Sequence, residues 1–213
     1  MEMNDIKLLA TKLEEIPRPG KIAHLKMAPK FRISSIDIFL NPPKDAKQAA
    51  VMILLYPDKM GELSFSLIQR TQYNGKHSGQ ISFPGGKTEQ NDDSLWQTAL
   101  RETQEEIGVV QSEVNFIKEL TPTFIPPSNF HVFPFLSYSQ NQPEFIPELD
   151  EVDHIIQIPL KLLMDDLSVQ KGIISASYAK AKVVPMFVFG DYEVWGATAM
   201  ILSELRELLR LVK

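Results

Sequence analysis

The sequence predicts an α+β fold in which a mixed β-sheet is sandwiched between helices. Short strand-like runs dominate the chain, one helix carries a group of carboxylates, and another helix with an apolar stripe closes the chain. The 213 residues are 44% hydrophobic and 23% charged, which is ordinary for a globular domain with a sizeable core. We therefore expect a single domain over residues 1–213, with an N-terminal helical extension over roughly residues 1–45.

The elements follow from the hydrophobic pattern. Two β-like runs on either side of a Pro-Asp-Lys-Met-Gly turn predict a hairpin. The expected strands cover residues 32–38, 49–56, 63–70, 81–83, 114–120, 130–138, 153–158, 173–178 and 183–189. The expected helices cover residues 5–16, 94–107 and 198–211, with a helical turn at 160–164. The proline-rich stretches at 17–43 and 122–127 are expected to run as surface segments and loops.

The helix expected after Ser94 carries the chemistry. Ser94 is a suitable N-cap and Gly108 a natural C-terminal stop. Apolar residues at helical spacing predict a core-facing side made of Trp96, Ala99, Leu100 and Ile107. Three carboxylates at positions i, i+3 and i+4 are expected together on another side, namely Glu102, Glu105 and Glu106.

This arrangement of carboxylates is unfavourable for a bare helix. Like charges at i and i+4, as in Glu102 and Glu106, cost about 0.2–0.5 kcal/mol, and acids in the last turn oppose the helix dipole. Arg101 relieves part of the repulsion by pairing with Glu105, and a divalent cation would relieve the rest, since Mg²⁺ binds carboxylates together with phosphate oxygens. The alternative is a solvated acidic face. The glycine turn Phe83–Gly86 just upstream, which can approach a phosphate, favours the cation.

The segment from Gly86 to Val109 resembles the signature of the Nudix hydrolases. Arg101, Glu102, Glu105, Glu106 and Gly108 match that signature by residue and spacing. Thr103 stands where an aliphatic residue is usual, and Asp93 stands where the first glutamate is expected. The interval from Gly86 to Arg101 is one residue longer than the general pattern, which is similar to the coenzyme A diphosphatase branch.

Other segments resemble the same branch. Arg70, Gly79 and the Phe83–Gly86 run match its upstream motif, whereas Gly75 replaces a second arginine and Lys76 is the nearest cation. Residues 126–135 and 195–199 are similar to its downstream segments. The resemblance covers roughly residues 49–209 and implies an α/β/α sandwich.

The resemblance also implies roles for individual residues. Glu102 and Glu106 would be ligands of Mg²⁺ or Mn²⁺, Glu105 a ligand or the general base, and Gly86 would offer its backbone to metal or phosphate. Arg101 would act in catalysis with Glu102 and Glu105, by orienting Glu105.

Three assignments stay open. Asp93 is either a helix-start acid or an outer partner of the site. A downstream acid such as Glu151 is an alternative general base. Phe130 and Tyr73 either stack an adenine ring or belong to the core.

Composition limits the partners. The net charge of −5 argues against nucleic-acid binding, so an anionic substrate must be attracted locally, by the metal and by Arg70, Lys76, His77 and Lys87. No run is long enough to span a membrane, no cysteine is present, and Met1–Asp5 lacks the features of a signal peptide. We expect a cytoplasmic protein, and the sequence leaves a monomer and a homodimer open.

Three functions follow from these observations. The first is a metal-dependent hydrolase that cuts coenzyme A or acyl-coenzyme A to adenosine 3′,5′-bisphosphate and 4′-phosphopantetheine or its derivative. The second is a Nudix diphosphatase for another nucleoside diphosphate derivative, such as ADP-ribose or a dinucleotide, which Gly75 favours. The third is a non-catalytic nucleotide-binding module, against which the complete set of carboxylates argues.

Overall fold

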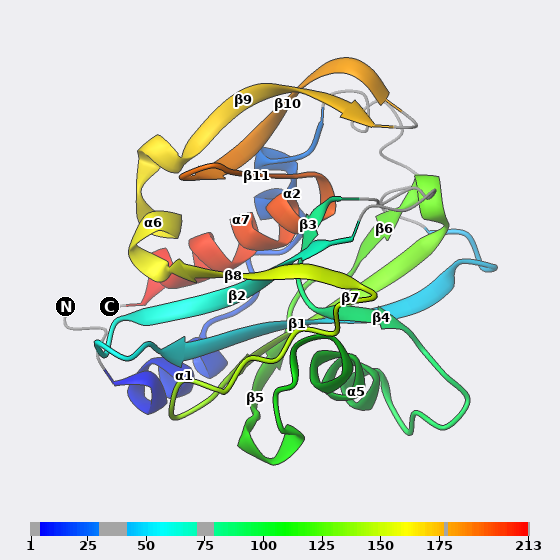
Figure 1. Cartoon of the computed structure of the whole chain (residues 1–213). Coiled ribbons are helices and arrows are strands. Elements are labelled where there is room, and N and C mark those ends of the chain that lie inside the picture. Colours follow the sequence, from blue (N-terminus) through cyan, green and yellow to red (C-terminus); the bar gives the residue numbers. More distant parts are fainter. Residues whose placement is uncertain (1–4, 30–41, 72–78, 177–178, 213) are drawn as a thin grey trace.

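A mixed β-sheet forms the centre of the molecule (Figure 1). The structure, a computed structural model, describes residues 5–29, 42–71, 79–176 and 179–212. The strand expected at 32–38 lies outside the described residues, as do Tyr73, Gly75, Lys76 and His77. Among the described residues, no helix is both long and apolar enough to span a membrane.

The central sheet has eight strands. They are β1 (Lys47–Pro57), β2 (Leu63–Arg70), β3 (Ile81–Ser82), β4 (Gly85–Lys87), β5 (Asn115–Glu119), β6 (Thr123–Ile125), β7 (Phe130–Tyr138) and β8 (Val152–Pro159). The main strand order is β3-β2-β1-β7-β5, with β4 paired to β1, β6 to β7 and β8 to β2. Strands β1 and β7 are parallel, whereas β1 and β2 form the expected antiparallel hairpin. The mixed sheet is thus confirmed.

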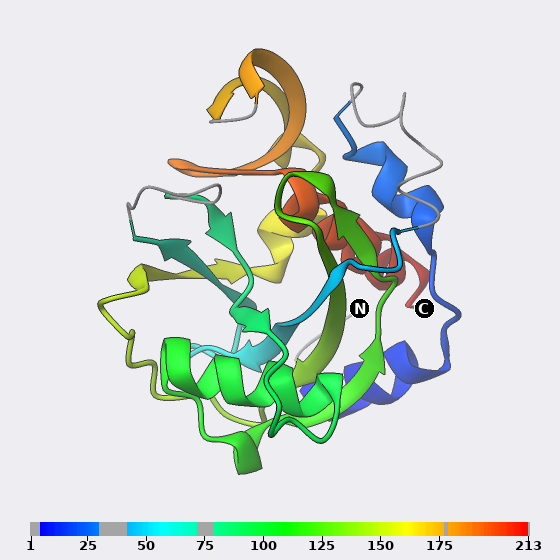
Figure 2. The ribbon, with the colours of Figure 1, turned by 90° about the vertical axis from the view of Figure 1, so that its right-hand side faces the viewer.

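The second sheet and the helices surround this centre. The smaller sheet has the order β11-β10-β9 and consists of β9 (Val169–Ala176), β10 (Ala179–Phe189) and β11 (Tyr192–Trp195). The helices are α1 (Ile6–Glu15), α2 (Lys21–Lys26), α5 (Leu95–Ile107), α6 (Leu160–Met164) and α7 (Gly196–Leu211). Short 3-10 turns lie at Gln111–Glu113, Pro126–Ser128 and Asp166–Ser168. Figure 2 shows the smaller sheet as a separate layer beyond the central one.

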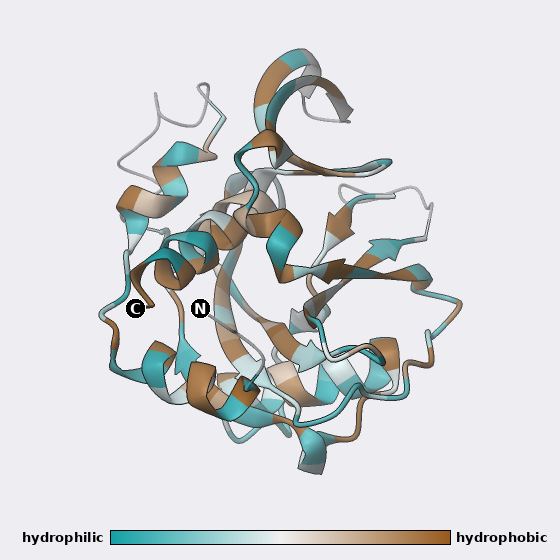
Figure 3. Cartoon of the chain, turned by 90° about the vertical axis from the view of Figure 1, so that its left-hand side faces the viewer, coloured by the Kyte–Doolittle hydropathy of each residue, from teal (hydrophilic) through white to brown (hydrophobic). Residues whose placement is uncertain are grey.

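Two hydrophobic clusters lie on opposite faces of the central sheet. Strand β1 is apolar along both faces: Ile53 and Leu55 join one cluster, while Met52 and Leu54 join the other. Residues of α1 and α7 join the first cluster and residues of α5 join the second. Figure 1 shows α7 and α5 on opposite sides of the central sheet. These helices show hydrophobic and hydrophilic segments in turn, as amphipathic helices do (Figure 3). The predicted sandwich is therefore confirmed.

Helix α2 and strands β4, β6 and β11 were not expected from the sequence. Strand β4 begins in the predicted glycine turn and pairs with β1. Helix α2 lies in the stretch predicted as a surface segment, because buried contacts of His24 with α7 hold this short helix. Strand β6 lies inside the predicted proline-rich loop, because the prolines end the strand without interrupting its pairing with β7. Strand β11 pairs with β10, and its last residue leads directly into α7 at Gly196.

Candidate active site

A glycine turn brings the backbone of β4 against the carboxylate helix. Gly85 has a φ of 145°, and a Cβ there would overlap the backbone of Ala50 and Val51 on β1. Glycine is therefore required for both the conformation and the close approach. The Gly85 N–H donates a hydrogen bond of 2.7 Å to Oε2 of Glu106. The turn thus fixes one of the predicted carboxylates.

Helix α5 begins and ends where the sequence predicted. The Ser94 hydroxyl accepts a hydrogen bond from the Gln97 N–H at 3.1 Å, and Gly108 closes the helix in the left-handed conformation. Ala99, Leu100 and Ile107 are buried under the sheet. These local signals suffice to place the carboxylates on the helix.

The three carboxylates differ in burial. The Glu105 side chain is 57% exposed, that of Glu102 14% and that of Glu106 only 2%. The three carboxylates therefore do not share one solvent-exposed face, because Glu106 points between the helix and the sheet. Tertiary partners explain the difference, because Arg70 on β2 and the Gly85 N–H both bind Glu106 in the interior.

Burial dominates the electrostatics of Glu106. Desolvation raises its pKa to about 7, although the positive charge of Arg70 and the Gly85 hydrogen bond lower it. The neighbouring charges of Glu102 and Glu151 raise the pKa further. A carboxylate in such surroundings is stabilised in its ionised form by any added positive charge.

Glu102 lies directly against Gly86. A Cβ built at Gly86 would overlap the Glu102 carboxylate, so only glycine lets this carboxylate approach the backbone of the turn so closely. Burial raises the pKa of Glu102, and Arg101 opposes that shift through its charge and a hydrogen bond of 3.0 Å. A partly desolvated carboxylate beside a glycine backbone supplies the oxygen donors that a small, hard cation prefers.

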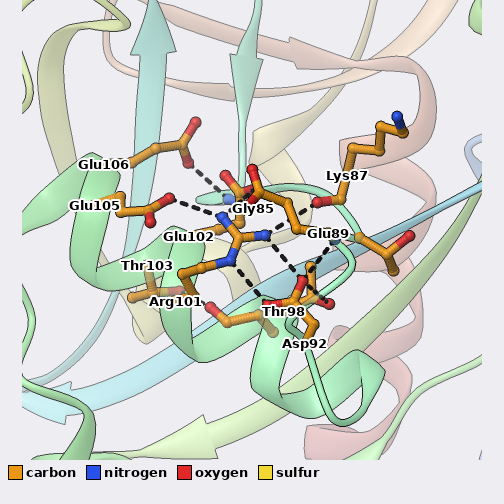
Figure 4. Close-up of polar contacts among 12 residues, drawn as sticks. Gly85, Lys87, Glu89, Asp92, Thr98, Arg101, Glu102, Thr103, Glu105 and Glu106 are labelled. Atoms are coloured by element: carbon orange, nitrogen blue, oxygen red, sulfur yellow. Dashed lines mark hydrogen bonds and ion pairs between the residues drawn. The ribbon is translucent and has the colours of Figure 1, made fainter.

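Arg101 is the centre of the polar network (Figure 4). Its Nη1 donates to Glu105 at 2.8 Å, as predicted, and to Glu102 at 3.0 Å. Its Nε and Nη2 donate to the two oxygens of Asp92 at 2.9 and 3.0 Å. Nη2 also donates to the Lys87 carbonyl at 3.1 Å. Arg101 therefore joins the carboxylates of the helix to the loop that precedes it.

Sequence reasoning missed Asp92. Hydrogen bonds from Arg101 hold the pKa of Asp92 well below its usual range, and the Glu89 N–H and the Thr98 hydroxyl add to the effect against the cost of burial. Asp93 is exposed, and the structure records no side-chain hydrogen bond or ion pair between it and the residues it describes. Asp93 is thus a helix-start acid, and Asp92 is the partner of Arg101. The one-residue increase in the interval from Gly86 to Arg101 was the available signal.

The remaining predicted residues lie at different distances from this network. Arg70 contacts Glu106 at 3.1 Å and lies 3.9 Å from Glu151, whose exposed carboxylate is therefore close to the site. The Lys87 side chain is exposed and points away from Arg101 (Figure 4). Lys76 and His77 fall outside the described residues.

The carboxylates do not form a complete metal site by themselves, but their chemistry suits a metal. Within the described ranges, no three His, Cys, Asp or Glu side chains converge on one point as a ready-made ion site. The carboxylates are instead bound by Arg70 and Arg101. The hard oxygen donors of Glu102, Glu105 and Glu106 fit a divalent cation that also takes ligands from substrate.

A cavity of about 310 Å³ opens beside the turn. One end is formed by Gly85, Gly86 and Lys87 together with Arg70. Apolar side chains from β6 and β7, from the end of β11 and from the start of α7 line the rest, among them Ile125, Phe130, Trp195 and Ala197. An anionic group at the turn can therefore carry an apolar substituent into the cavity.

Known proteins match this chain over most of its length. The NUDIX domain family matches residues 46–173. "Nudix hydrolase 15, mitochondrial" of Arabidopsis thaliana is 33% identical over 73% of this chain. The match spans 56% of that protein, so this chain corresponds to about half of its length. "Uncharacterized Nudix hydrolase NudL" of Pectobacterium atrosepticum is 31% identical over 78% of this chain and 84% of that protein. The human "Mitochondrial coenzyme A diphosphatase NUDT8" is 29% identical over 76% of this chain and 69% of that protein.

Solved structures agree in fold. The Nudix hydrolase RenU of M. smegmatis superposes with a TM-score of 0.55 at 13% identity, covering 79% of this chain and 88% of that one. The NUDIX domain of Shewanella oneidensis NrtR, solved with ADP ribose, gives a TM-score of 0.51 at 16% identity and covers 82% of this chain and 97% of that one. At these identities the likeness concerns the fold alone.

Proposed function

We propose that this chain, which belongs to the Nudix hydrolase family, hydrolyses the diphosphate bond of coenzyme A or acyl-coenzyme A. The products would be adenosine 3′,5′-bisphosphate and 4′-phosphopantetheine or its acyl derivative. One observation carries the diphosphatase assignment: Glu102, Glu105 and Glu106 lie around the glycine turn that forms one end of the cavity. This is where a diphosphate and a divalent cation would meet.

Glu102 and Glu106 would hold Mg²⁺ or Mn²⁺, with Glu105 as a further ligand or the base and with the backbone of Gly86 nearby. When bound, the cation polarises phosphoryl oxygens and neutralises negative charge that develops on the diphosphate. The role of Glu102 as a ligand is supported by its partial desolvation and by the close approach of its carboxylate to the Gly86 backbone. The role of Glu106 as a ligand is supported by its burial, because a nearby cation would favour the ionised form of this desolvated carboxylate.

The chain's own residues would position the reactants. Glu105, exposed and oriented by Arg101, is available to accept a proton from the attacking water. Glu151 is the alternative base, since its carboxylate lies beside Arg70 at the same site. Arg70 and Lys87 line the cavity and would bind phosphate oxygens, and we keep Lys76 and His77 as further phosphate contacts.

The coenzyme A branch is supported by the sequence motifs and by relatives that are named coenzyme A diphosphatases. Gly75 in place of a second arginine favours the alternative, a diphosphatase for ADP-ribose or a dinucleotide. The cytoplasmic location and the choice between monomer and homodimer remain predictions, and relatives carry mitochondrial, chloroplastic or peroxisomal names. Cell fractionation and light scattering would test these two points.

A substrate panel tests the proposal. Coenzyme A, acetyl-coenzyme A, ADP-ribose and diadenosine tetraphosphate are each incubated with the protein and Mg²⁺ or Mn²⁺, and the products are identified by mass. We expect adenosine 3′,5′-bisphosphate and 4′-phosphopantetheine from coenzyme A, and no product with EDTA. Cleavage of ADP-ribose alone would support the alternative, and metal-independent turnover would contradict the proposed chemistry.

A further inference from the structure

The cavity is completed by a part of the chain beyond the matched family domain. The NUDIX match ends at residue 173, whereas Trp195 and Ala197 line the cavity from the end of β11 and the start of α7. The catalytic end belongs to the matched range, because Gly85, Gly86 and Lys87 lie in β4. Residues 195–198 of the lining therefore lie beyond the matched range, whereas Phe130 and the glycine turn lie within it.

We propose that Trp195, together with Phe130, forms the binding wall for the purine base of the substrate and so determines specificity for the nucleoside half. This inference rests on the proposed function, because it places the diphosphate at the glycine turn. From there, one substituent of the diphosphate enters the cavity and the other extends into solvent.

The volume of the cavity limits what enters it. Ligand pockets usually measure about 300–1,000 Å³, so 310 Å³ accommodates one end of a molecule of this kind and not the whole. The charged side chains in the described lining are Arg70 and Lys87, which are both cationic and are assigned above to the phosphates. The rest is mostly apolar, which suits a flat heterocycle better than a charged group.

The two substituents of the diphosphate in coenzyme A, the pantetheine arm and the adenosine, differ in how well they fit this lining. A pantetheine arm is a flexible chain with two amides, so it needs several hydrogen-bond partners and loses much conformational entropy on binding. The uncharged polar side chains in the lining are Gln80, Ser82, Ser128 and Thr198. Two of them are already engaged, because the Ser128 hydroxyl donates to the Ile125 carbonyl at 3.5 Å and the Thr198 hydroxyl to the Ile81 carbonyl at 3.1 Å. A purine is rigid and stacks on aromatic rings, with little such loss.

The smaller sheet holds Trp195 in position. Trp195 is paired with Met186 across β10 and β11, and its side chain packs against the cluster of Ile174, Val184 and Met186. Gly196, with a φ of 69°, then turns the chain into α7. The indole is thus placed by a packed element and needs no rearrangement to serve as a wall.

Tryptophan fluorescence tests the inference without turnover. The chain has two tryptophans, and Trp96 packs against Phe116 and Phe135 on the opposite face of the sheet. Trp96→Phe therefore leaves Trp195 as the single tryptophan. We titrate this variant with AMP and, separately, with 4′-phosphopantetheine, both without divalent metal. We expect a saturable change in emission with AMP and none with 4′-phosphopantetheine.

Calorimetric titration with AMP gives a second readout. Trp195→Ala should weaken AMP binding about tenfold or more, since stacking on an aromatic side chain contributes on that scale. Trp195→Phe should bind AMP with an affinity within about threefold of that of the unaltered protein, because an aromatic ring remains at this position. Glu193→Ala, an exposed position on the same strand, is the matched control.

Each result separates this inference from the proposed function. AMP carries the nucleoside half that coenzyme A and ADP-ribose share, so the test does not depend on which of them is cut. An emission change with 4′-phosphopantetheine instead of AMP, or equal effects of Trp195→Ala and Glu193→Ala, would overturn the inference. If Trp195→Ala does not fold, the fluorescence titration of Trp96→Phe with AMP and with 4′-phosphopantetheine still tests the inference. AMP binding at Trp195 without hydrolysis of any panel substrate would refute the proposed function alone.

Discussion

Arg101 donates two hydrogen bonds to the two oxygens of Asp92, from Nε at 2.9 Å and from Nη2 at 3.0 Å. Such paired contacts between a guanidinium and a carboxylate fix both groups in one plane. The third nitrogen of Arg101 is thereby aimed at Glu102 and Glu105. Asp92 thus positions the carboxylates of α5 through Arg101, without reaching the cavity itself.

Asp92→Asn should lower kcat about 10- to 100-fold, with a smaller effect on KM, because it loosens Arg101 and through it the carboxylates. That range is typical for removal of an outer partner from a metal site. Steady-state kinetics with saturating Mg²⁺ measures the effect. Asp93→Asn is the matched control and should stay within about twofold, since that side chain is exposed. Equal losses in the two variants would show that Asp92 has no special role.

Arg101→Ala should lower kcat more than it raises KM, because Arg101 orients Glu105 and does not bind the substrate. Arg101→Lys should recover little of the loss, since an ammonium cannot make the paired contact with Asp92. Comparison of kcat and KM for the two variants provides the test. A change in KM alone would mean that Arg101 contacts the substrate phosphates.

Glu106→Gln should lower kcat at least about 100-fold, the scale of losing one electrostatic stabiliser. It should also abolish the rise in melting temperature that Mg²⁺ gives to the unaltered protein, because a bound ion stabilises the folded state by mass action. Differential scanning fluorimetry with and without Mg²⁺ measures this change in melting temperature. Glu113→Gln, in the 3-10 turn after α5, is the control. A Mg²⁺ shift of normal size in Glu106→Gln would contradict its assignment as a ligand.

Glu204 should make stability depend on pH. Its buried carboxylate accepts hydrogen bonds from Gly20, His24 and Thr121. Burial alone would raise its pKa, but these bonds outweigh burial and lower it. Because the pKa of Glu204 is lower in the folded state than in the unfolded state, its charge stabilises the fold at pH values above the unfolded pKa of about 4.3. This stabilisation is lost as the pH falls through the folded-state pKa.

Glu204→Gln should therefore reduce the free energy of unfolding by roughly 1–3 kcal/mol at pH 7. The difference from the unaltered protein should shrink steadily as the pH is lowered below about 4.3. Urea unfolding at a series of pH values measures both. A difference that stays constant with pH would show that the charge of Glu204 does not contribute to stability.

The helix of the site was predictable because its signals are local. Ser94, Gly108 and the spacing of the glutamates act within one stretch of sequence, and the structure places α5 accordingly. Burial of Glu106 was not predictable, because Arg70 lies 36 residues upstream. The partnership of Asp92 with Arg101 likewise depends on the shape of the loop between β4 and α5.

The cavity was even less accessible to sequence reasoning. Phe130 had two open roles, and its place in the lining required the fold. Trp195 belongs to a segment that resembles the coenzyme A diphosphatase branch, but its place in the lining was not predictable, because the four-residue strand β11 depends on pairing with β10. Helix α2 is similar, since six residues form a stable helix only with tertiary contacts such as that between His24 and Glu204.

The ratio of kcat/KM for coenzyme A to that for its 3′-dephospho form tests the central claim most directly, with ADP-ribose measured on the same preparation. The 3′-phosphate needs a cation, and we predict that Arg70 or Lys76 supplies it in place of the arginine missing at Gly75. Charge-assisted contacts of this kind correspond to a preference of roughly ten- to a hundredfold for coenzyme A. Faster cleavage of the dephospho form or of ADP-ribose would contradict the coenzyme A assignment and leave only a general Nudix diphosphatase.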